Sequence, residues 1–436
     1  MTKTIIIPSC DDGNRGDQAL VWQTRQIAQA AGLADECKMI TDNLNGSVQS
    51  QEEGIGLLVP ILGHPASRYQ PKSNLEYGKM IFLVWGLISL FDGFRSFLLL
   101  LKPTRKLASL FLNEAERETF SEIATSDACF VKGGGFIHSM NSAADSYKAY
   151  FLLYHVFLAQ SLGVPVYVMP NSFGPFGGAL YQFIVRRALK RCRVVTSRES
   201  ISQNMLSGIG IESERFPDLA FGLESEPVEP GALTDFKRIA SGRPIVGITA
   251  RPYRFPGSND PANSYKSYVF EMANTAKGLF ERGYFPVFVE HVVSEGVHEK
   301  DIAAIEAIVG ELEDGQFGVF SNPSLNCRQI KSLYGECDFV IGTRFHSVIF
   351  ALAEGTPAFA VGYGGNKSKG IMKDIGLPSN VVAIEDFTAE LALERFEALV
   401  ENKLFNLQVK DLSERAKKLH MELVDQIRLD ASSRRY

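Results

Sequence analysis

The chain of 436 residues has few features that would set it apart from ordinary globular proteins. Its six cysteines are scattered, and no two have metal-ligand spacing, which argues against a zinc ribbon. The net charge of −5 excludes the dense basic surface that general nucleic-acid binding needs. The apolar run at residues 5–7 is too short for a signal peptide and is soon followed by acids. We therefore expect reduced core thiols in a cytoplasmic protein that does not bind nucleic acid.

Long apolar runs are also scarce, with one exception at Met80–Leu101. This segment is nearly long enough to cross a bilayer, which takes about 20 apolar residues. It contains Asp92 and Arg95, however, and charges at that depth cost several kcal/mol. A buried helix is the plainest interpretation. The alternatives are a lid that faces an acceptor, or an interfacial helix that gives peripheral contact with the inner face of the cell membrane.

Short apolar runs alternate with stretches of helical spacing, which predicts an α/β fold with doubly wound, mainly parallel sheets. The alternation stops at residues 224–243, where Gly, Pro, Ser and acids predominate, and we expect an interdomain linker there. Two Rossmann-like domains are predicted, at residues 1–223 and 244–403, facing a central cleft. Residues 404–436 are predicted to form a C-terminal helix that could pack back on the first domain.

Ligands of such sheets bind beyond the carboxyl ends of the strands, so polar residues at those ends are candidates. In the first domain, Asp17 stands near a helix start, where it could act in catalysis or simply cap free N–H groups. Consecutive glycines could let the backbone approach an anion, and these are Gly133, Gly134 and Gly135. Their spacing is neither the dinucleotide fingerprint nor a Walker loop, so neither NAD nor ATP binding follows.

Further polar residues follow other strands of the first domain. His138 could contact a substrate or simply pack. Asn171 and Ser172 could bind sugar hydroxyls or shape a turn. Arg198 is placed to meet an anion, although a salt bridge with Glu199 or another acid would explain it as well.

The candidates of the second domain are mainly cations. Arg251 leaves its first strand towards the cleft, where a guanidinium suits a phosphate or a carboxylate. Arg344 and His346, in "GTRFHS", stand at a strand end and in the next helical turn, where the helix dipole would reinforce anion binding. An imidazole there could act as a general acid, because its ordinary pKa lies near neutrality. A second anion-compatible loop contains Gly364, Gly365 and Lys367. No cluster has metal-ligand spacing, and no metal is expected.

Taken together, "GNRGDQAL", "KGGGFIHS", "PNSFGPF", "SRES", "PDLAF" and "GTRFHSVIFALAEGTPAFAVGYGGNKSKG" resemble the motifs of the polysaccharide pyruvyltransferases. The resemblance covers about Ile5–Gly376, and the last motif is the most specific. The segment Met80–Leu101 is not part of the motif set. The resemblance implies an architecture similar to that of the GT-B glycosyltransferases, with the acceptor on the first domain and the donor on the second.

The family implies transfer of pyruvate from phosphoenolpyruvate, as a ketal, onto two hydroxyls of a sugar in an exopolysaccharide or other cell-surface glycan. The acceptor is often lipid-linked, and phosphoenolpyruvate is a co-substrate, so no cofactor is expected. By resemblance the histidine and the arginine of the R-x-H motif map to His346 and Arg344. We hypothesise that His346 is the general acid and that Arg344 holds the donor. Asp17 is our candidate for the base. Other donor contacts are expected from Arg251, Arg198, Lys367, Gly364 and Gly365. Acceptor or anion contacts are expected from Gly133, Gly134, Gly135, His138, Asn171 and Ser172.

Two other functions fit parts of the sequence. The run "AEGTPAFAVGYGG" also resembles the nucleotide-contacting region of GT-B nucleotide-sugar glycosyltransferases. Against this, Glu354 lacks an obvious second acid for a ribose later in the loop. The other alternative is a non-catalytic glycan-binding or scaffold protein at the membrane. A proton donor such as His346 would be unnecessary for binding alone.

Overall fold

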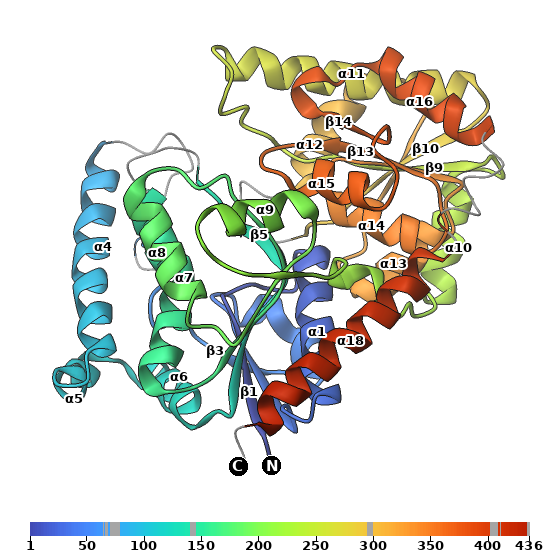
Figure 1. Cartoon of the computed structure of the whole chain (residues 1–436). Helices are drawn as coiled ribbons and strands as arrows, with labels where there is room; N and C mark the ends of the chain where they lie inside the picture. Colours follow the sequence, from blue (N-terminus) through green and yellow to red (C-terminus); the bar gives the residue numbers. More distant parts are fainter. Residues whose placement is uncertain are drawn as a thin grey trace.

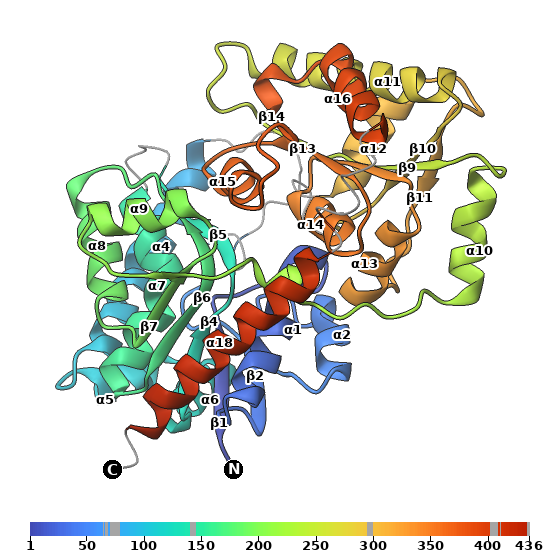
Figure 2. The same ribbon diagram turned by 45° about the vertical axis from the view of Figure 1, so that its right-hand side comes forward.

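Alternating strands and helices build two α/β domains, one above the other in Figure 1. This computed structural model describes residues 1–63, 65, 69, 79–139, 145–293, 300–401, 409 and 411–433. Every strand pairing among these residues is parallel, and helices cover both sheets (Figures 1 and 2). The predicted fold class, two doubly wound domains, is therefore confirmed.

The sheet of the first domain has the order β3-β2-β1-β4-β6-β7-β8, and β5 pairs with β6. Its strands are β1 Lys3–Ile7, β2 Glu36–Ile40, β3 Gly56–Leu58, β4 Ala128–Val131, β5 Gly134–Ile137, β6 Val166–Phe173, β7 Val194–Ser197 and β8 Glu214–Arg215. Its helices are α1 Arg15–Ala30, α2 Val48–Glu52, α4 Lys79–Leu100, α5 Arg105–Ala108, α6 Glu114–Thr125, α7 Asp145–Leu162, α8 Ala179–Leu189 and α9 Ser200–Gly208, with 3₁₀ turns η1 Asn45–Ser47, η2 Ser109–Phe111 and η3 Leu219–Phe221. The strand order reverses between β1 and β4, and such a switch point is where ligands bind.

The sheet of the second domain has the order β11-β10-β9-β12-β13-β14. Its strands are β9 Ile245–Thr249, β10 Phe285–Val289, β11 Gly318–Phe320, β12 Phe339–Gly342, β13 Ala358–Gly362 and β14 Val381–Ala383. Its helices are α10 Pro230–Ile239, α11 Pro261–Glu281, α12 Asp301–Val309, α13 Cys327–Gly335, α14 Phe345–Ala353, α15 Lys367–Asp374 and α16 Ala389–Glu401, with the 3₁₀ turn η4 Ile384–Asp386. The segment expected as a linker thus contains α10.

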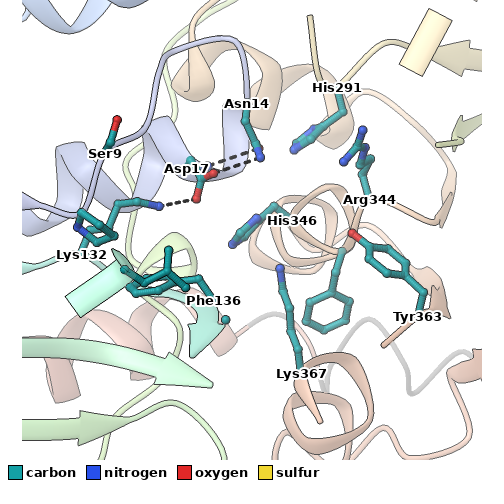
Figure 3. A pocket seen from close by; sticks show the side chains of 15 residues that line it. Ser9, Asn14, Asp17, Lys132, Phe136, His291, Arg344, His346, Tyr363 and Lys367 are labelled. Atoms are coloured by element: carbon teal, nitrogen blue, oxygen red, sulfur yellow. Dashed lines mark hydrogen bonds and ion pairs between the residues drawn. The ribbon is translucent and has the colours of Figure 1, made fainter. Parts of the chain in front are cut away.

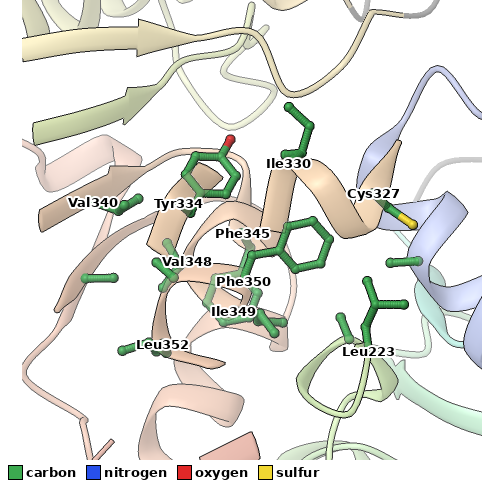
Figure 4. Close-up of a cluster of buried hydrophobic side chains, with 14 of the residues drawn as sticks. Leu223, Cys327, Ile330, Tyr334, Val340, Phe345, Val348, Ile349, Phe350 and Leu352 are labelled. Carbon is green, nitrogen blue, oxygen red and sulfur yellow. The ribbon is translucent and has the colours of Figure 1, made fainter. Parts of the chain in front are cut away.

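Apolar packing fixes the position of α14, which begins at the switch between β9 and β12. Val348, Ile349 and Phe350 on this helix are fully buried, against Tyr334 of α13 and Val340 of β12 (Figure 4). A helix that is apolar on nearly all sides is stable only when it is enclosed in this way. Its first turn, with His346, is consequently held rigidly at the domain boundary.

The last helix, α18 Leu412–Ser432, returns to the first domain (Figure 1). It packs against α1, and the guanidinium of Arg428 donates to the carbonyl of Ala30 at 2.7 Å. The hydroxyl of Tyr167 on β6 donates to Asp430 at 2.8 Å. The C-terminal helix therefore braces the first domain after the chain has completed the second.

The expectation that Met80–Leu101 forms a buried helix is wrong. Helix α4 stands at the outer edge of the first domain (Figure 1), and Leu87 and Phe94 are 62% and 63% exposed. Within the described residues, Leu83–Leu100 is the stretch long and apolar enough to cross a membrane, yet only 22% of it is buried. Packing against the core thus does not explain its apolar composition.

Candidate active site

A cavity of about 260 Å³ lies between the carboxyl ends of the two sheets, and Figure 3 shows its walls. Both domains contribute to it. Its lining consists of Pro8, Ser9, Asn14, Asp17, Lys132, Gly134, Gly135, Phe136, Leu152, His291, Arg344, Phe345, His346, Tyr363 and Lys367. The residues of the first domain follow β1 and β4, the strands that flank the switch point.

The loop after β1 connects the domains directly. The amide of Val293 donates to the carbonyl of Gly13 at 2.7 Å, and Arg15 donates to the carbonyl of Pro323 at 2.6 Å. Asn14 caps α1, because its side-chain oxygen accepts from the amides of the first turn. These bonds fix the start of α1 against the second domain.

Asp17, in the first turn of α1, forms an ion pair with Lys132 rather than capping the helix. Its carboxylate accepts from the ammonium of Lys132 at 2.5 Å and from the amide of Asn14 at 3.1 Å. Burial alone would raise the pKa of Asp17, but the charge of Lys132 and its hydrogen bond outweigh burial and hold that pKa below its usual value. Asp17 is therefore an ionised carboxylate on the wall of the cavity.

His346 lies at the centre of the cavity wall, in the first turn of α14 (Figure 3). Its ring occupies the space beside Gly16, since a Cβ added to that glycine would lie 2.0 Å from the Nδ1 of His346. Its Nε2 lies 3.9 Å from a carboxylate oxygen of Asp218 and has no hydrogen-bond partner among the described residues. Burial, followed by the charges of Lys367 and Arg198, lowers the pKa of His346 well below its ordinary value.

The imidazole of His346 does not titrate near neutrality, unlike an ordinary histidine. The ring is neutral at pH 7, because burial and neighbouring cations disfavour the imidazolium. A neutral imidazole accepts a proton readily but is a poor donor. Any role as an acid thus requires a bound anion that offsets the surrounding positive charge.

Arg344 and His291 form one side of the cavity (Figure 3). The Nε of Arg344 donates to Asp301 at 2.6 Å, and burial raises the pKa of this carboxyl to about 6. Asp301 also accepts from the backbone amide of His291 at 3.0 Å, so a single carboxylate orients both residues. The Nδ1 of His291 lies 3.2 Å from the hydroxyl of Tyr334, which fixes its ring.

Lys367, in the first turn of α15, points towards the ring of His346 (Figure 3). Its ammonium lies 5.6 Å from the ring centre of Phe345. Burial, with the nearby charge of Arg198, lowers the pKa of Lys367 to about 7. The lysine is therefore close to half protonated at neutral pH, and an anion beside it would restore its full charge.

A second cavity, of about 370 Å³, adjoins the first and shares Gly135, Phe345, Tyr363 and Lys367 with it. Its other predicted lining residues are His138, Ser172, Gly364 and Gly365. Both glycines of the pair have a positive φ, 51° and 67°, which other residues rarely adopt. The loop that contains Gly364, Gly365 and Lys367 therefore forms one end of the space that the two adjoining cavities make together.

One protein family matches most of the chain. The family described as polysaccharide pyruvyl transferase matches residues 14–365, which include every predicted site residue except Lys367. The chain belongs to this family. Its predicted assignment is thereby confirmed, and with it the broader class of transferase.

A curated relative and several solved structures are similar to the chain. The amylovoran biosynthesis protein AmsJ of Erwinia amylovora is 24% identical over 245 residues, which span 55% of this chain and 58% of that protein. Sucrose-phosphate synthase from Thermosynechococcus elongatus superposes with a TM-score of 0.55 at 13% identity, covering 100% of this chain and 99% of that one. HepE of Anabaena, solved with UDP and glucose, gives 0.52 at 10% identity and covers 99% of each chain. These structures show the predicted GT-B-like fold and nothing further about the chemistry.

Some predicted site residues lie behind the cavities rather than on their walls. Arg198 is fully buried, bonded to Asp218 at 2.5 Å and to the hydroxyl of Ser172 at 2.8 Å. The acid that pairs with Arg198 is thus Asp218 and not Glu199. One nitrogen of Arg198 lacks a partner among the described residues, and a Cβ at Gly135 would lie 2.9 Å from it. Its charge contributes to the lowered pKa values of Lys367 and His346, which both line the first cavity.

Three other predicted residues do not line either cavity. Arg251 stacks on the ring of Tyr363 at 4.2 Å, outside the lining. The side-chain amide of Asn171 donates to the carbonyl of Lys132 at 2.8 Å and so shapes the loop behind the cavity. Gly133 lies close to Leu20, since a Cβ there would be 3.0 Å from that side chain.

Two basic residues of the cavity were given no role from the sequence: Lys132, which was placed at a strand end and left undecided, and His291. Both directly follow or lie near the end of a buried parallel strand, β4 and β10, where ligands of doubly wound sheets bind. Applied to every strand, this rule would have found them. No group of three metal-ligating side chains occurs in the part of the chain that the structure describes.

Proposed function

We propose that the protein transfers the pyruvyl group of phosphoenolpyruvate to two hydroxyls of a saccharide, forming a ketal and releasing phosphate. One observation carries this proposal. The buried cavity gathers more positive than negative groups, and burial together with the neighbouring cations lowers the pKa of both Lys367 and His346. A small ligand with several negative charges is the natural complement of such a site, and phosphoenolpyruvate has a phosphate and a carboxylate.

The donor fits beside the second domain. Arg344, whose Nε donates to Asp301, contributes a positive charge to the cavity wall, and Lys367 contributes a second one. The first turns of α14 and α15 both line this cavity, and the dipoles of the two helices favour an anion there. Two anionic groups held by separate cations would fix both ends of the molecule.

The chemistry needs one proton at the donor carbon and two new carbon–oxygen bonds. A proton added to the methylene carbon gives an oxocarbenium-like centre at the adjacent carbon. One sugar hydroxyl attacks that carbon, and the bond between the carbon and the phosphate oxygen breaks. A second hydroxyl then attacks the same carbon and closes the ketal ring. The two hydroxyl protons balance the one gained by the methyl carbon and the one taken up by phosphate.

His346 is the proposed proton donor, but only in the donor complex. The negative charges of phosphoenolpyruvate would offset those of Lys367 and Arg198 and raise the pKa of the imidazole. The proton donor would then form only when its substrate is present, which prevents unproductive protonation. Lys367 keeps its own proton in that complex, because the same anion raises its pKa.

Asp17 is the proposed acceptor-side group. Its carboxylate is ionised and lies on the wall formed by the first domain, across the cavity from the donor cations. A carboxylate with a lowered pKa is a weak base, which suffices when the attacked centre is already cationic. Lys132 orients it at 2.5 Å.

The test is phosphate release from phosphoenolpyruvate with a panel of glycan acceptors, run beside a panel of UDP- and GDP-sugars. We expect release only when phosphoenolpyruvate and a suitable diol are both present. Turnover with nucleotide sugars alone would overturn the proposal in favour of a glycosyltransferase. A His346→Ala protein that retained full turnover would remove the assigned acid but leave pyruvyl transfer intact.

A further inference from the structure

Helix α4 exposes its apolar face and buries its polar face, the reverse of an ordinary surface helix. A stripe of large apolar side chains runs along its outer face at helical spacing, and the exposed members are Met80, Leu83, Leu87, Leu90, Phe91, Phe94 and Phe97. Its buried face contains Asp92, Arg95 and Ser96. Surface helices in water normally bury their apolar stripe and expose their polar one. The outer face of α4 is therefore suited to apolar surroundings.

The polar face of α4 is fixed to the body of the domain. Arg95 forms two bonds to the carboxylate of Glu116 on α6, at 2.8 and 2.9 Å, and donates to the carbonyl of Ile61 at 2.9 Å. Ser96 lies 2.9 Å from the hydroxyl of Tyr150 on α7. Detaching α4 to cross a bilayer would strip these buried charges of their partners at a cost of several kcal/mol.

The apolar surface continues beyond the helix and is accompanied by positive charge. Leu107, Leu110 and Phe111, in α5 and η2, are all more than 60% exposed. Between residues 79 and 112 the sequence has five lysines or arginines, of which Arg95 is buried, and one acid, the buried Asp92; the exposed acids Glu114 and Glu118 follow on α6. Exposed cations beside the apolar side chains include Lys102 and Lys106.

Helix α8 adds a second strip of exposed apolar and basic side chains. It belongs with α4 because α7 packs against both helices, and Figures 1 and 2 place both on the same side of the first domain. Leu180 and Phe183 are exposed, and residues 174–197 contain no acid. The exposed cations of this strip are Arg186, Arg187, Lys190 and Arg191.

We propose that the outer faces of α4, α5, η2 and α8 form a docking surface for a bilayer that contains anionic lipids. The apolar side chains would enter the boundary between headgroups and acyl chains, and the cations would lie at the headgroups. A symmetric pairing of two copies through this surface would instead bring like charges together. Charge therefore favours the membrane over a second copy of the chain.

The proposed surface leads towards the active site. A cavity of about 690 Å³ beside it is lined by Phe91 and Phe111 of the surface and by polar side chains that include Asp42 and Asn43. Asp42 accepts from the hydroxyl of Ser9, which lines the active-site cavity, at 3.0 Å. If the proposed function holds, a saccharide anchored to a lipid could extend along this path; the docking itself does not depend on it.

The experiment is flotation of the full chain with two kinds of vesicle, phosphatidylcholine alone and phosphatidylcholine with 30 to 40 parts in about 100 of phosphatidylglycerol. We expect binding to the anionic vesicles that weakens as salt is added. The double variant Leu87→Glu/Phe94→Glu and the double variant Lys102→Glu/Lys106→Glu should each reduce the partition coefficient by at least about tenfold.

Matched controls change the same residue types elsewhere. Phe270→Glu/Met421→Glu replaces two apolar side chains that are 54% and 52% exposed on α11 and α18. Lys266→Glu/Lys277→Glu reverses two exposed lysines on α11. Both controls should float as the unaltered protein does, and unchanged thermal melting of all four variants would show that each one folds.

Three results would overturn the proposal. They are failure to bind anionic vesicles, equal loss in the controls, and dimerisation that Leu87→Glu/Phe94→Glu abolishes while vesicles remain unbound. Pyruvyl transfer to a soluble acceptor is measured separately on the same variants. Docking can therefore fail while transfer succeeds, and the reverse result is equally distinguishable.

Discussion

The ring of His346 lies directly against the backbone of Gly16, across the boundary between the two domains. A Cβ on that glycine would stand 2.0 Å from Nδ1 and 2.5 Å from Cγ of the imidazole. Gly16, the second glycine of "GNRGD", is thus explained by the close approach of the imidazole and not by a special backbone conformation. The two most separated motifs of the chain meet at this contact.

Gly16→Ala should consequently displace His346 without unfolding either domain. Because a misplacement of about 1 Å can reduce a rate about 100-fold, we expect kcat/KM for pyruvyl transfer to fall by at least that factor. Steady-state kinetics with thermal melting would measure it. Gly231→Ala is the matched control, since nothing lies within 4 Å of its Cβ position. Equal activity in both variants would mean that the imidazole tolerates movement.

The pKa of Lys367, lowered to about 7, predicts a pH dependence for donor binding. A lysine with a lowered pKa loses its charge as pH rises through that value, so affinity for an anion should decline above about pH 7. We expect kcat/KM for phosphoenolpyruvate to fall along this limb. Lys367→Arg should lack the limb between pH 7 and 9, because a guanidinium stays protonated there. A limb that persisted in this variant would assign the titration to another group.

The same group affects folding in the opposite direction. Between pH 7 and the ordinary pKa of lysine, the unfolded chain holds this proton while the folded protein does not. Stability from this residue should therefore increase as pH rises through that window. Urea unfolding of the unaltered protein and of Lys367→Met at pH 7 and pH 9 would measure the difference, and an equal pH response in both would contradict it.

Asp17→Asn should separate turnover from donor binding. Loss of the acceptor-side carboxylate should lower kcat by about 100-fold or more. The KM for phosphoenolpyruvate should not increase, because removing a negative charge from a cationic cavity favours an anion. Initial-rate kinetics and calorimetry of donor binding would test both statements. Asp235→Asn, at an exposed surface pair, serves as the control.

Arg344 and Arg251 should differ in their effect on the donor. Arg344 lines the cavity, and Arg344→Gln should weaken binding of phosphoenolpyruvate by about 10- to 100-fold. Arg251 lies outside the lining, and Arg251→Ala should change that affinity by less than about fivefold. Isothermal calorimetry would compare the two variants.

The removal of Arg344 also leaves Asp301 without its ion partner, which would destabilise the fold by about 3–5 kcal/mol. The double variant Arg344→Gln/Asp301→Asn avoids a lone buried charge. We expect it to recover stability but not donor binding. If binding returned as well, the role of Arg344 would be limited to supporting the fold.

The fold was predictable because buried parallel strands such as β9 and β12 are apolar throughout, whatever their ligand. The strand-end rule placed Asp17, Arg344 and His346 at one edge, and all three line the cavity. It could not tell which way a side chain points. Asn171 therefore looked like a ligand contact although it bonds to the loop behind the site.

Other features depend on long-range contacts that spacing does not encode. The partner of Asp17 is Lys132, 115 residues away, and the pKa of His346 is lowered by burial and by cations from three other segments. The exposure of helix α4 could not be predicted from the sequence either, because a run of apolar residues has the same composition whether it is enclosed or exposed. Its polar face could be recognised only once Glu116 was placed beside Arg95.

The return of α18 makes the first domain discontinuous in sequence, so the chain crosses between the domains twice. The start of α18 lies beside the end of the first segment, since the hydroxyl of Ser413 donates to the carbonyl of Phe221 at 3.0 Å. Residues 1–223 therefore lack one element of their own domain, because α18 packs against α1. During synthesis, the first domain can be completed only after the second domain and α18 have been made.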